Sequence, residues 1–130
     1  MHMIQAIIIE DEKAAMENVL YALSQTGMAI TVKMVLSSVQ ESIQYFTSGE
    51  RADIIFSDVQ LCDGLSFVIF NEANIHIPVV FITGYDEFML NAFEHNGIDY
   101  LLKPVTTTDI TKALLKYQKA LISMRRLSVV

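Results

Sequence analysis

The sequence has one cysteine, no long apolar run and no recognisable leader. Cys62 has no second cysteine with which to form an internal disulfide. The start, Met-His-Met-Ile-Gln, lacks the basic end and long apolar stretch of a secretory signal. Apolar runs such as residues 78–82 are far shorter than the roughly 18 to 20 residues that a membrane-spanning helix needs. We therefore expect a soluble protein of the reducing cytoplasm, with no membrane partner.

Basic residues are also scarce. Nine Lys and Arg stand against fifteen Asp and Glu, for a formal net charge of -6. This balance leaves no basic face for phosphate backbones, so direct nucleic-acid binding by these residues is not expected. The hydrophobic content of 52% over 130 residues is typical of one compact domain with a large core. The sequence shows no internal repeat and no Pro- or Ser-rich linker.

Short apolar runs alternate with segments of helical periodicity. The runs, rich in β-branched residues, predict five strands near residues 4–9, 30–36, 53–56, 79–82 and 98–102. The periodic segments predict five helices: one closed by Gly27, one from Val39 to about Thr47 capped by Ser38, one over residues 65–71, one from Asp86 to about Phe93, and one capped by Thr107 or Thr108. Strict alternation predicts right-handed crossovers and a doubly wound α/β domain with a parallel sheet.

Polar residues follow four of the predicted strands. They are Glu10-Asp11-Glu12, Ser57-Asp58, Thr83-Gly84 and Lys103-Pro104. In an open parallel sheet, ligands bind outside the carboxyl ends of the strands, so these groups predict one site. Clustered carboxylates repel one another unless a cation neutralises them, and Mg²⁺ prefers hard oxygen ligands. Phosphoryl chemistry fits this set, because an aspartate can act as nucleophile, a lysine can pair with the added charge and a threonine can donate a hydrogen bond.

The same residues resemble those of the response-regulator receiver domains across almost the whole chain. Ile7-Ile8-Ile9-Glu10-Asp11-Glu12 is similar to the acidic pocket of that family, and residues 55–61 with Asp63-Gly64 are similar to its phosphoacceptor segment. Thr83, Tyr100 and Lys103-Pro104 match its switch hydroxyl, switch aromatic and Lys-Pro pair. The stretches 81–88 and 96–104 most resemble receivers of LytTR-type transcription regulators. The resemblance implies a flavodoxin-like sheet with strand order 2-1-3-4-5.

The resemblance also implies a role for each matching residue. Asp58 would accept the phosphoryl group, with Thr83 and Lys103 assisting, so that the domain catalyses only its own phosphorylation and dephosphorylation and is not otherwise an enzyme. Asp11 and Asp58 would bind Mg²⁺ directly, Gln60 through its backbone carbonyl and Glu10 through water. Glu10 stands where the family more often has aspartate. The Lys103-Pro104 bond would be cis.

The resemblance further implies a phosphoacceptor switch of a two-component system. A sensor histidine kinase would be the phosphoryl source, and Thr83 and Tyr100 would reshape the surface of helix 4, strand 5 and helix 5 to control an output, expected to be transcription. Residues 1–122 would form the receiver domain, and residues 123–130 the end of the last helix or the start of a linker to a DNA-binding output domain outside this chain. A phosphorylation-dependent homodimer is a further expectation.

Two other functions remain open on the sequence. A receiver-like interaction module would have the same fold without accepting phosphate, although the presence of Asp11, Asp58, Thr83 and Lys103 argues against it. An aspartate-nucleophile phosphatase would also use acidic strand ends and magnesium. Such an enzyme is expected to carry a second acid two residues after the nucleophile, where this sequence has Gln60.

Overall fold

Five parallel strands form the central sheet of the protein. A computed structural model describes the chain except residues 1–2, 86–87, 89–90, 93 and 130, with side chains described as far as residue 123. The strands are β1 (Ile4–Ile9), β2 (Ile30–Leu36), β3 (Ile54–Ser57), β6 (Val79–Thr83) and β7 (Gly97–Leu102). Their order is β2-β1-β3-β6-β7, and every pairing is parallel. The predicted 2-1-3-4-5 order of a doubly wound, flavodoxin-like sheet is therefore confirmed.

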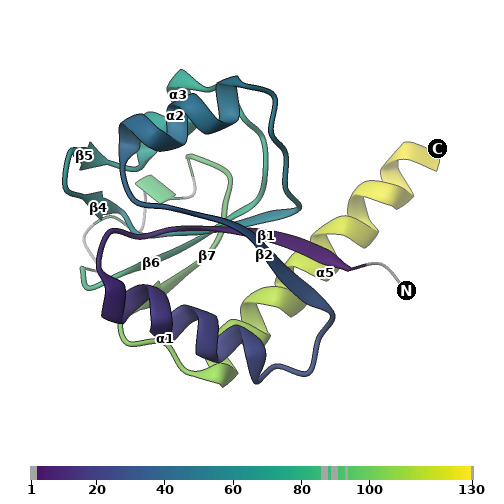
Figure 1. The fold of residues 1–130 in the computed structure, drawn as a ribbon. Coiled ribbons are helices and arrows are strands. Elements are labelled where there is room, and N and C mark those ends of the chain that lie inside the picture. The colour runs from purple at the N-terminus through teal and green to yellow at the C-terminus, as the bar shows by residue number, and fades with distance from the viewer. Residues whose placement is uncertain (1–2, 86–87, 89–90, 93, 130) are drawn as a thin grey trace.

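Helices cover both faces of this sheet. Helices α1 (Lys13–Ser24) and α5 (Thr107–Val129) lie on one face, and α2 (Val39–Thr47) and α3 (Phe67–Glu72) lie on the other (Figure 1). Because side chains alternate along a strand, β1 contributes to both layers. Ile4, Ala6 and Ile8 belong to the core beneath α1 and α5, whereas Ile7 and Ile9 belong to the core beneath α2 and α3. This double burial explains why the strand is apolar on both sides.

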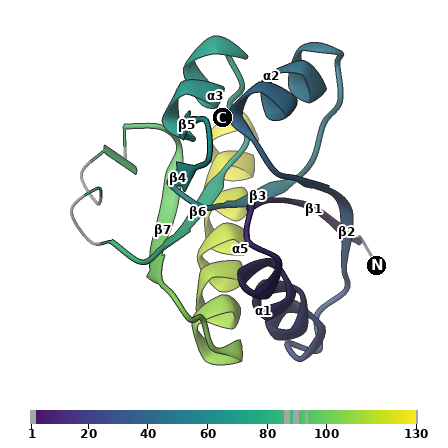
Figure 2. The same ribbon diagram turned by 60° about the vertical axis from the view of Figure 1, so that its left-hand side comes forward.

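Between β3 and β7, one feature differs from the sequence prediction, and one predicted helix lies largely outside the described residues. A short antiparallel hairpin, β4 (Gln60–Leu61) and β5 (Gly64–Leu65), precedes α3, which begins at Phe67 and not at residue 65 (Figure 2). Gly64 has a φ of 145°, which the hairpin can accept because glycine has no side chain. The helix predicted from Asp86 to about Phe93 lies largely outside the described residues, and the described part of the chain contains the four helices named above.

The helix caps follow local hydrogen-bond chemistry. The Ser38 hydroxyl accepts a hydrogen bond from the Glu41 N–H at 3.0 Å, which confirms the predicted cap of α2. For α5 the prediction of Thr107 or Thr108 is wrong. The Thr106 hydroxyl accepts from the Asp109 N–H and the Asp109 carboxylate accepts from the Thr106 N–H, both at 3.1 Å. This reciprocal pair satisfies two main-chain donors at once, and it places the helix start directly after the Lys103-Pro104 segment.

Candidate functional site

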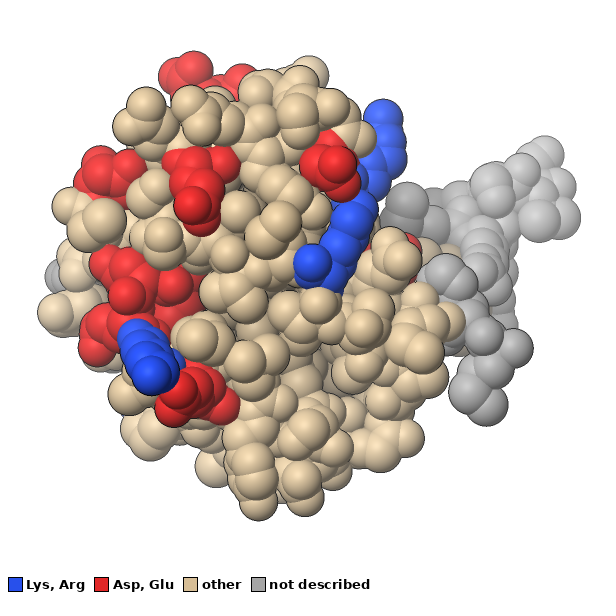
Figure 3. Space-filling model, viewed as in Figure 1, with Lys and Arg blue, Asp and Glu red and all other residues tan. Residues whose placement is uncertain are grey.

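The carboxyl ends of β1, β3, β6 and β7 meet at one edge of the sheet. Acidic side chains gather on the same side of the molecule in the space-filling view (Figure 3, compare Figure 1). The register of the sheet pairs Ile9 with Ser57, Ser57 with Phe81, and Thr83 with Leu102. Residues that follow these strands are therefore brought to a common edge although they are far apart in sequence.

Asp58 lies at this edge with its carboxylate buried and held on both oxygens. Only 6% of its side chain is exposed. Its Oδ1 accepts hydrogen bonds from the N–H groups of Val59 at 2.7 Å and Gln60 at 3.3 Å. Its Oδ2 accepts from the Lys103 Nζ at 2.8 Å. The main chain that turns into the β4–β5 hairpin thus fixes the carboxylate, and one oxygen is directed toward the lysine.

One amine bridges the acid that follows β3 and the acid that follows β1. Lys103 Nζ lies 2.8 Å from Asp58 Oδ2 and 2.7 Å from Glu10 Oε1, and the Glu10 side chain is only 4% exposed. The Lys103-Pro104 peptide bond is cis, as the family resemblance implied. Lys103 is anchored by its N–H, which donates to the Thr83 carbonyl at 2.8 Å. The sequence predicted that Lys103 would lie at the site of Asp58 and pair with the added phosphoryl charge, but it did not predict the contact with Glu10.

Burial and ion pairing shift the pKa values of Glu10 and Lys103 in opposite directions. Burial raises the pKa of Glu10, and the hydrogen bonds from Lys103 and from the Glu12 N–H only partly offset this rise. For Lys103, burial alone would lower the pKa, but the hydrogen bonds to Asp58 and Glu10 and the charges of those carboxylates raise it above its ordinary value. The amine is therefore held in its charged form, which keeps it available to pair with anions.

Three carboxylates form a group that has the composition of a divalent-cation site. Oxygens of Glu10, Asp11 and Glu12 lie within 4.8 Å of one another, and Asp11 and Glu12 are exposed. Asp11 and Glu10 were predicted as ligands, whereas Glu12 was placed in the acidic motif without a role. The other two predicted ligands are Asp58, joined to Glu10 through the shared amine, and Gln60, whose side chain is exposed and whose N–H faces Asp58.

The predicted switch residues are connected through the main chain of Tyr85. Thr83 is fully buried at the end of β6, and its hydroxyl accepts a hydrogen bond from the Tyr85 N–H at 3.4 Å. The Tyr100 hydroxyl, from β7, donates to the Tyr85 carbonyl. The sequence places Tyr85 beside the site, but it did not predict that the main chain of Tyr85 links Thr83 to Tyr100, because a main-chain group carries no residue-type signal.

Asp63 has a structural role that the sequence motif did not reveal. Its carboxylate accepts hydrogen bonds from the N–H groups of Val39 at 2.8 Å and Gln40 at 3.0 Å, the first residues of α2. These two bonds lower the pKa of Asp63. Asp63 thus ties the hairpin that follows Asp58 to a helix N-terminus, where negative charge is favoured.

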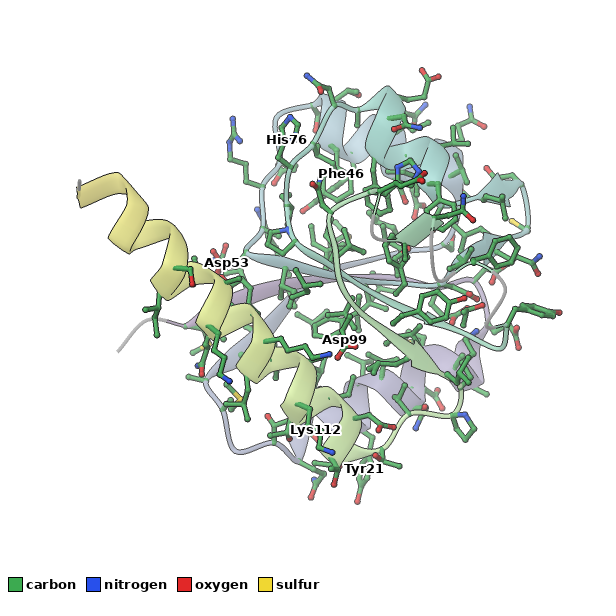
Figure 4. The ribbon with its side chains drawn as sticks, turned by 180° about the vertical axis from the view of Figure 1, so that it is seen from behind. Tyr21, Phe46, Asp53, His76, Asp99 and Lys112 are labelled. Atoms are coloured by element: carbon green, nitrogen blue, oxygen red, sulfur yellow. The ribbon has the colours of Figure 1, made fainter. Side chains whose placement is uncertain are left out.

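A cavity of about 360 Å³ lies away from these strand ends. Its lining includes Phe46, near the end of α2, and His76, in the loop that follows α3; both are labelled in Figure 4. None of the residues discussed above lines it. This cavity is therefore separate from the strand-end residues described above.

The fold and the site together define a class of protein: a doubly wound α/β domain with a buried aspartate, a lysine and an acidic group at the carboxyl ends of its strands. A family model confirms the class, since that of the response regulator receiver domain matches residues 6–115. The chain belongs to this family. Among the described residues, no helix is both long enough and apolar enough to span a membrane.

Curated relatives place the chain near LytT- and LytR-type regulators. It is 33% identical over 126 residues to the sensory transduction protein LytT of Bacillus cereus, covering 90% of this chain and 48% of that protein. It is 30% identical over 116 residues to the sensory transduction protein LytR of Streptococcus mutans, covering 87% of this chain and 48% of that protein. The chain thus spans about half the length of these relatives.

Solved structures agree with the fold. The response regulatory domain of mrkE from Klebsiella pneumoniae superposes with a TM-score of 0.76 at 26% identity, covering 89% of this chain and 96% of that one. A response regulator receiver domain protein from Clostridium thermocellum gives a TM-score of 0.72 at 23% identity, covering 92% and 99% of the two chains, and supports the fold alone.

Proposed function

We propose that this receiver domain is a phosphoacceptor switch in which Asp58 accepts a phosphoryl group from a phosphohistidine of a sensor histidine kinase. The observation that carries the proposal is the 2.8 Å contact between Asp58 Oδ2 and Lys103 Nζ beside an acidic cluster. A carboxylate can act as the nucleophile in phosphoryl transfer, and the amine fixed beside it offsets the negative charge that the phosphoryl group adds.

The transfer step uses groups of this chain in defined roles. A carboxylate oxygen of Asp58 forms the new P–O bond as the P–N bond of the phosphohistidine breaks. The electron pair of that bond leaves on the imidazole nitrogen, which takes up a proton from water. Lys103 pairs with the phosphoryl oxygens, while the N–H groups of Val59 and Gln60 keep the aspartate oriented.

The residues at this edge fit a magnesium site by the chemistry of their donors. Glu10, Asp11 and Asp58 offer hard carboxylate oxygens, and Gln60 is proposed to add its backbone carbonyl. The proximity of Glu10, Asp11 and Glu12 supports the assignment, because it brings three carboxylate oxygens within reach of one ion. When bound, Mg²⁺ would neutralise charge on the transferring phosphoryl group.

The readout is proposed to pass through Thr83, Tyr85 and Tyr100. A phosphoryl oxygen on Asp58 attracts the Thr83 hydroxyl, which then leaves the Tyr85 N–H. The Tyr85 carbonyl is the acceptor for the Tyr100 hydroxyl, so a shift of this main chain changes the position of the Tyr100 ring. The surface of β7 and α5 is altered as a result, and this surface is where we expect an output to be controlled.

The remaining partners follow from the relatives and the length of the chain. Since LytT- and LytR-type proteins are about twice as long as this chain, we propose that residues 1–122 act as the receiver and that the end of α5 leads to a DNA-binding output domain. The helix continues to Val129, as a rigid connector would. Phosphorylation is proposed to favour a homodimer and to regulate transcription in the cytoplasm.

A phosphodonor experiment tests the proposal. The protein is treated with a small phosphodonor and Mg²⁺, and its intact mass is measured. We expect one added phosphoryl group, and none in Asp58→Asn. Asp53→Asn is the matched control, because Asp53 precedes β3 whereas Asp58 follows it (Figure 4). This substitution should leave phosphorylation intact. An unchanged mass would favour a non-phosphorylated interaction module, and sustained hydrolysis of a phosphomonoester would favour a phosphatase.

A further inference from the structure

Asn18 of α1 makes a two-point contact with the main chain of Val105. Its Nδ2 donates to the Val105 carbonyl at 3.1 Å, and its Oδ1 accepts from the Val105 N–H at 3.0 Å. The side chain is partly buried, and Val105 is 4% exposed. A carboxamide has both a donor and an acceptor, so it satisfies both main-chain groups of one residue. Aspartate lacks the donor, and leucine, of similar shape, lacks both.

This contact lies immediately beside the lysine of the site. Val105 is separated from Lys103 only by Pro104, which has no N–H to donate. On the sheet side, the Lys103 N–H is bound to the Thr83 carbonyl at 2.8 Å. On the helix side, Asn18 supplies the two bonds to Val105. The lysine is therefore held between β6 and α1, and Thr106, which caps α5, follows Val105 directly.

The helix that carries Asn18 also begins where the acidic cluster ends. Helix α1 starts at Lys13, the residue after Glu12. Asn18 thus fixes the main chain that bears the amine to the helix that follows the acids. The Lys103 amine lies 2.7 Å from the Glu10 carboxylate and 2.8 Å from that of Asp58.

We propose that Asn18 is a positioning residue that holds the Lys103 amine against Asp58 and Glu10. Its importance for phosphoryl transfer rests on the proposed function. A misplacement of about 1 Å at a reacting group can slow a reaction about 100-fold, and Asn18→Leu would remove only one of the two attachments of the Lys103 segment, so we expect it to slow phosphorylation by about 10-fold.

The position of the amine can be measured without phosphorylation. In the full chain, mild acetylation followed by mass spectrometry gives the labelling rate of Lys103 relative to that of Lys33, which lies on β2 at the far edge of the sheet. In the parent, the amine is occupied by two carboxylates and its side chain is 21% exposed. We expect the Lys103 to Lys33 ratio to rise several-fold in Asn18→Leu and to a smaller extent in Asn18→Asp, which retains the acceptor.

Val19→Ala is the control for general destabilisation, because Val19 is a buried core residue of the same helix that is not part of the site. It should leave the labelling ratio and the phosphorylation rate unchanged. Asn18→Leu should also have no further effect on the phosphorylation rate in a Lys103→Ala background, since the two residues act through the same amine.

The proposal fails if the labelling ratio of Asn18→Leu equals that of the parent, or if Val19→Ala raises the ratio equally. It also fails if Asn18→Leu slows phosphorylation by the same factor whether or not Lys103 is present. If the parent accepts no phosphoryl group, the proposed function fails instead, and the labelling ratio still decides whether Asn18 holds the amine.

Discussion

Replacing Lys103 with methionine tests the electrostatic balance of the site. Methionine has a similar length and no charge, so the substitution removes the cation that lies 2.7 Å from Glu10 and 2.8 Å from Asp58. The two buried carboxylates then keep only their main-chain hydrogen bonds and lose the cation that lies between them. Breaking a buried ion pair typically costs 3–5 kcal/mol, and because 21% of the lysine side chain is exposed we expect the lower end, about 3 kcal/mol at neutral pH.

The pH dependence of this loss has a defined sign. Burial raises the pKa of Glu10 above its ordinary 4.5 even with the amine present, and without the amine the pKa should rise further. Above pH 4.5 the folded variant then binds more protons than its unfolded state, so its free energy of unfolding falls as the pH rises. In the parent, the raised pKa of Lys103 stabilises the fold fully below 10.5, and this contribution is lost as the pH rises through the folded value. The difference between the two proteins should therefore be small in acid and largest from neutrality to about pH 10.

Urea unfolding followed by circular dichroism measures this difference at several pH values, since the chain contains no tryptophan. Lys33→Met is the matched control: Lys33 pairs with Glu50 at 3.1 Å, but both side chains are substantially exposed, so it should cost less than about 1 kcal/mol. Added Mg²⁺ should recover part of the stability lost in Lys103→Met by supplying another cation. A Lys103→Met protein as stable as the parent at every pH would refute the electrostatic reasoning.

Two further substitutions probe the fold, one at the start of β7 and one in the hairpin that follows Asp58. A Cβ at Gly97 would lie 2.4 Å from the Ala92 carbonyl oxygen, so Gly97→Ala should lower the free energy of unfolding by about 1–3 kcal/mol in the same urea experiment, and an unchanged midpoint would contradict this close approach. The pKa of Asp63 is lowered from 3.8 by the N–H groups of Val39 and Gln40, so its contribution to stability is present above that value and lost as the pH falls through the folded pKa. Asp63→Asn should accordingly destabilise the protein at neutral pH and have little effect in acid, and an equal effect at both pH values would argue against the cap.

The strands were predictable because burial on both faces leaves a clear record in the sequence. Residues 7–9 are apolar without interruption, as expected for a strand between two helical layers, and the structure buries all three. The β4–β5 hairpin was not predictable in the same way. Each of its strands has two residues, too few for a periodic pattern, and its conformation depends on Gly64 and on the contacts that Asp63 makes with α2.

The site was predictable as a set of strand ends but not as a network. Parallel strands must bring Asp58 and Lys103 to one edge, and this follows from topology. Whether Glu10 or Asp11 contacts the lysine depends on side-chain direction, and in the structure the buried Glu10 makes the contact while Asp11 is exposed. The pairing of Asn18 with Val105 spans 87 positions and leaves no local signal.

The geometry at Thr83 bears on how far phosphorylation can shift the proposed switch. At 3.4 Å, the bond from the Tyr85 N–H to the Thr83 hydroxyl is near the long limit for a hydrogen bond, so breaking it costs no more than about 1 kcal/mol. Moving a two-state equilibrium from 1:99 to 99:1 requires about 5.5 kcal/mol of differential stabilisation. Release of this one bond neither supplies nor blocks a shift of that size. In the proposed switch, we expect the driving force to come from new contacts of the phosphoryl group with Thr83 and Lys103, so a displaced amine should weaken the response.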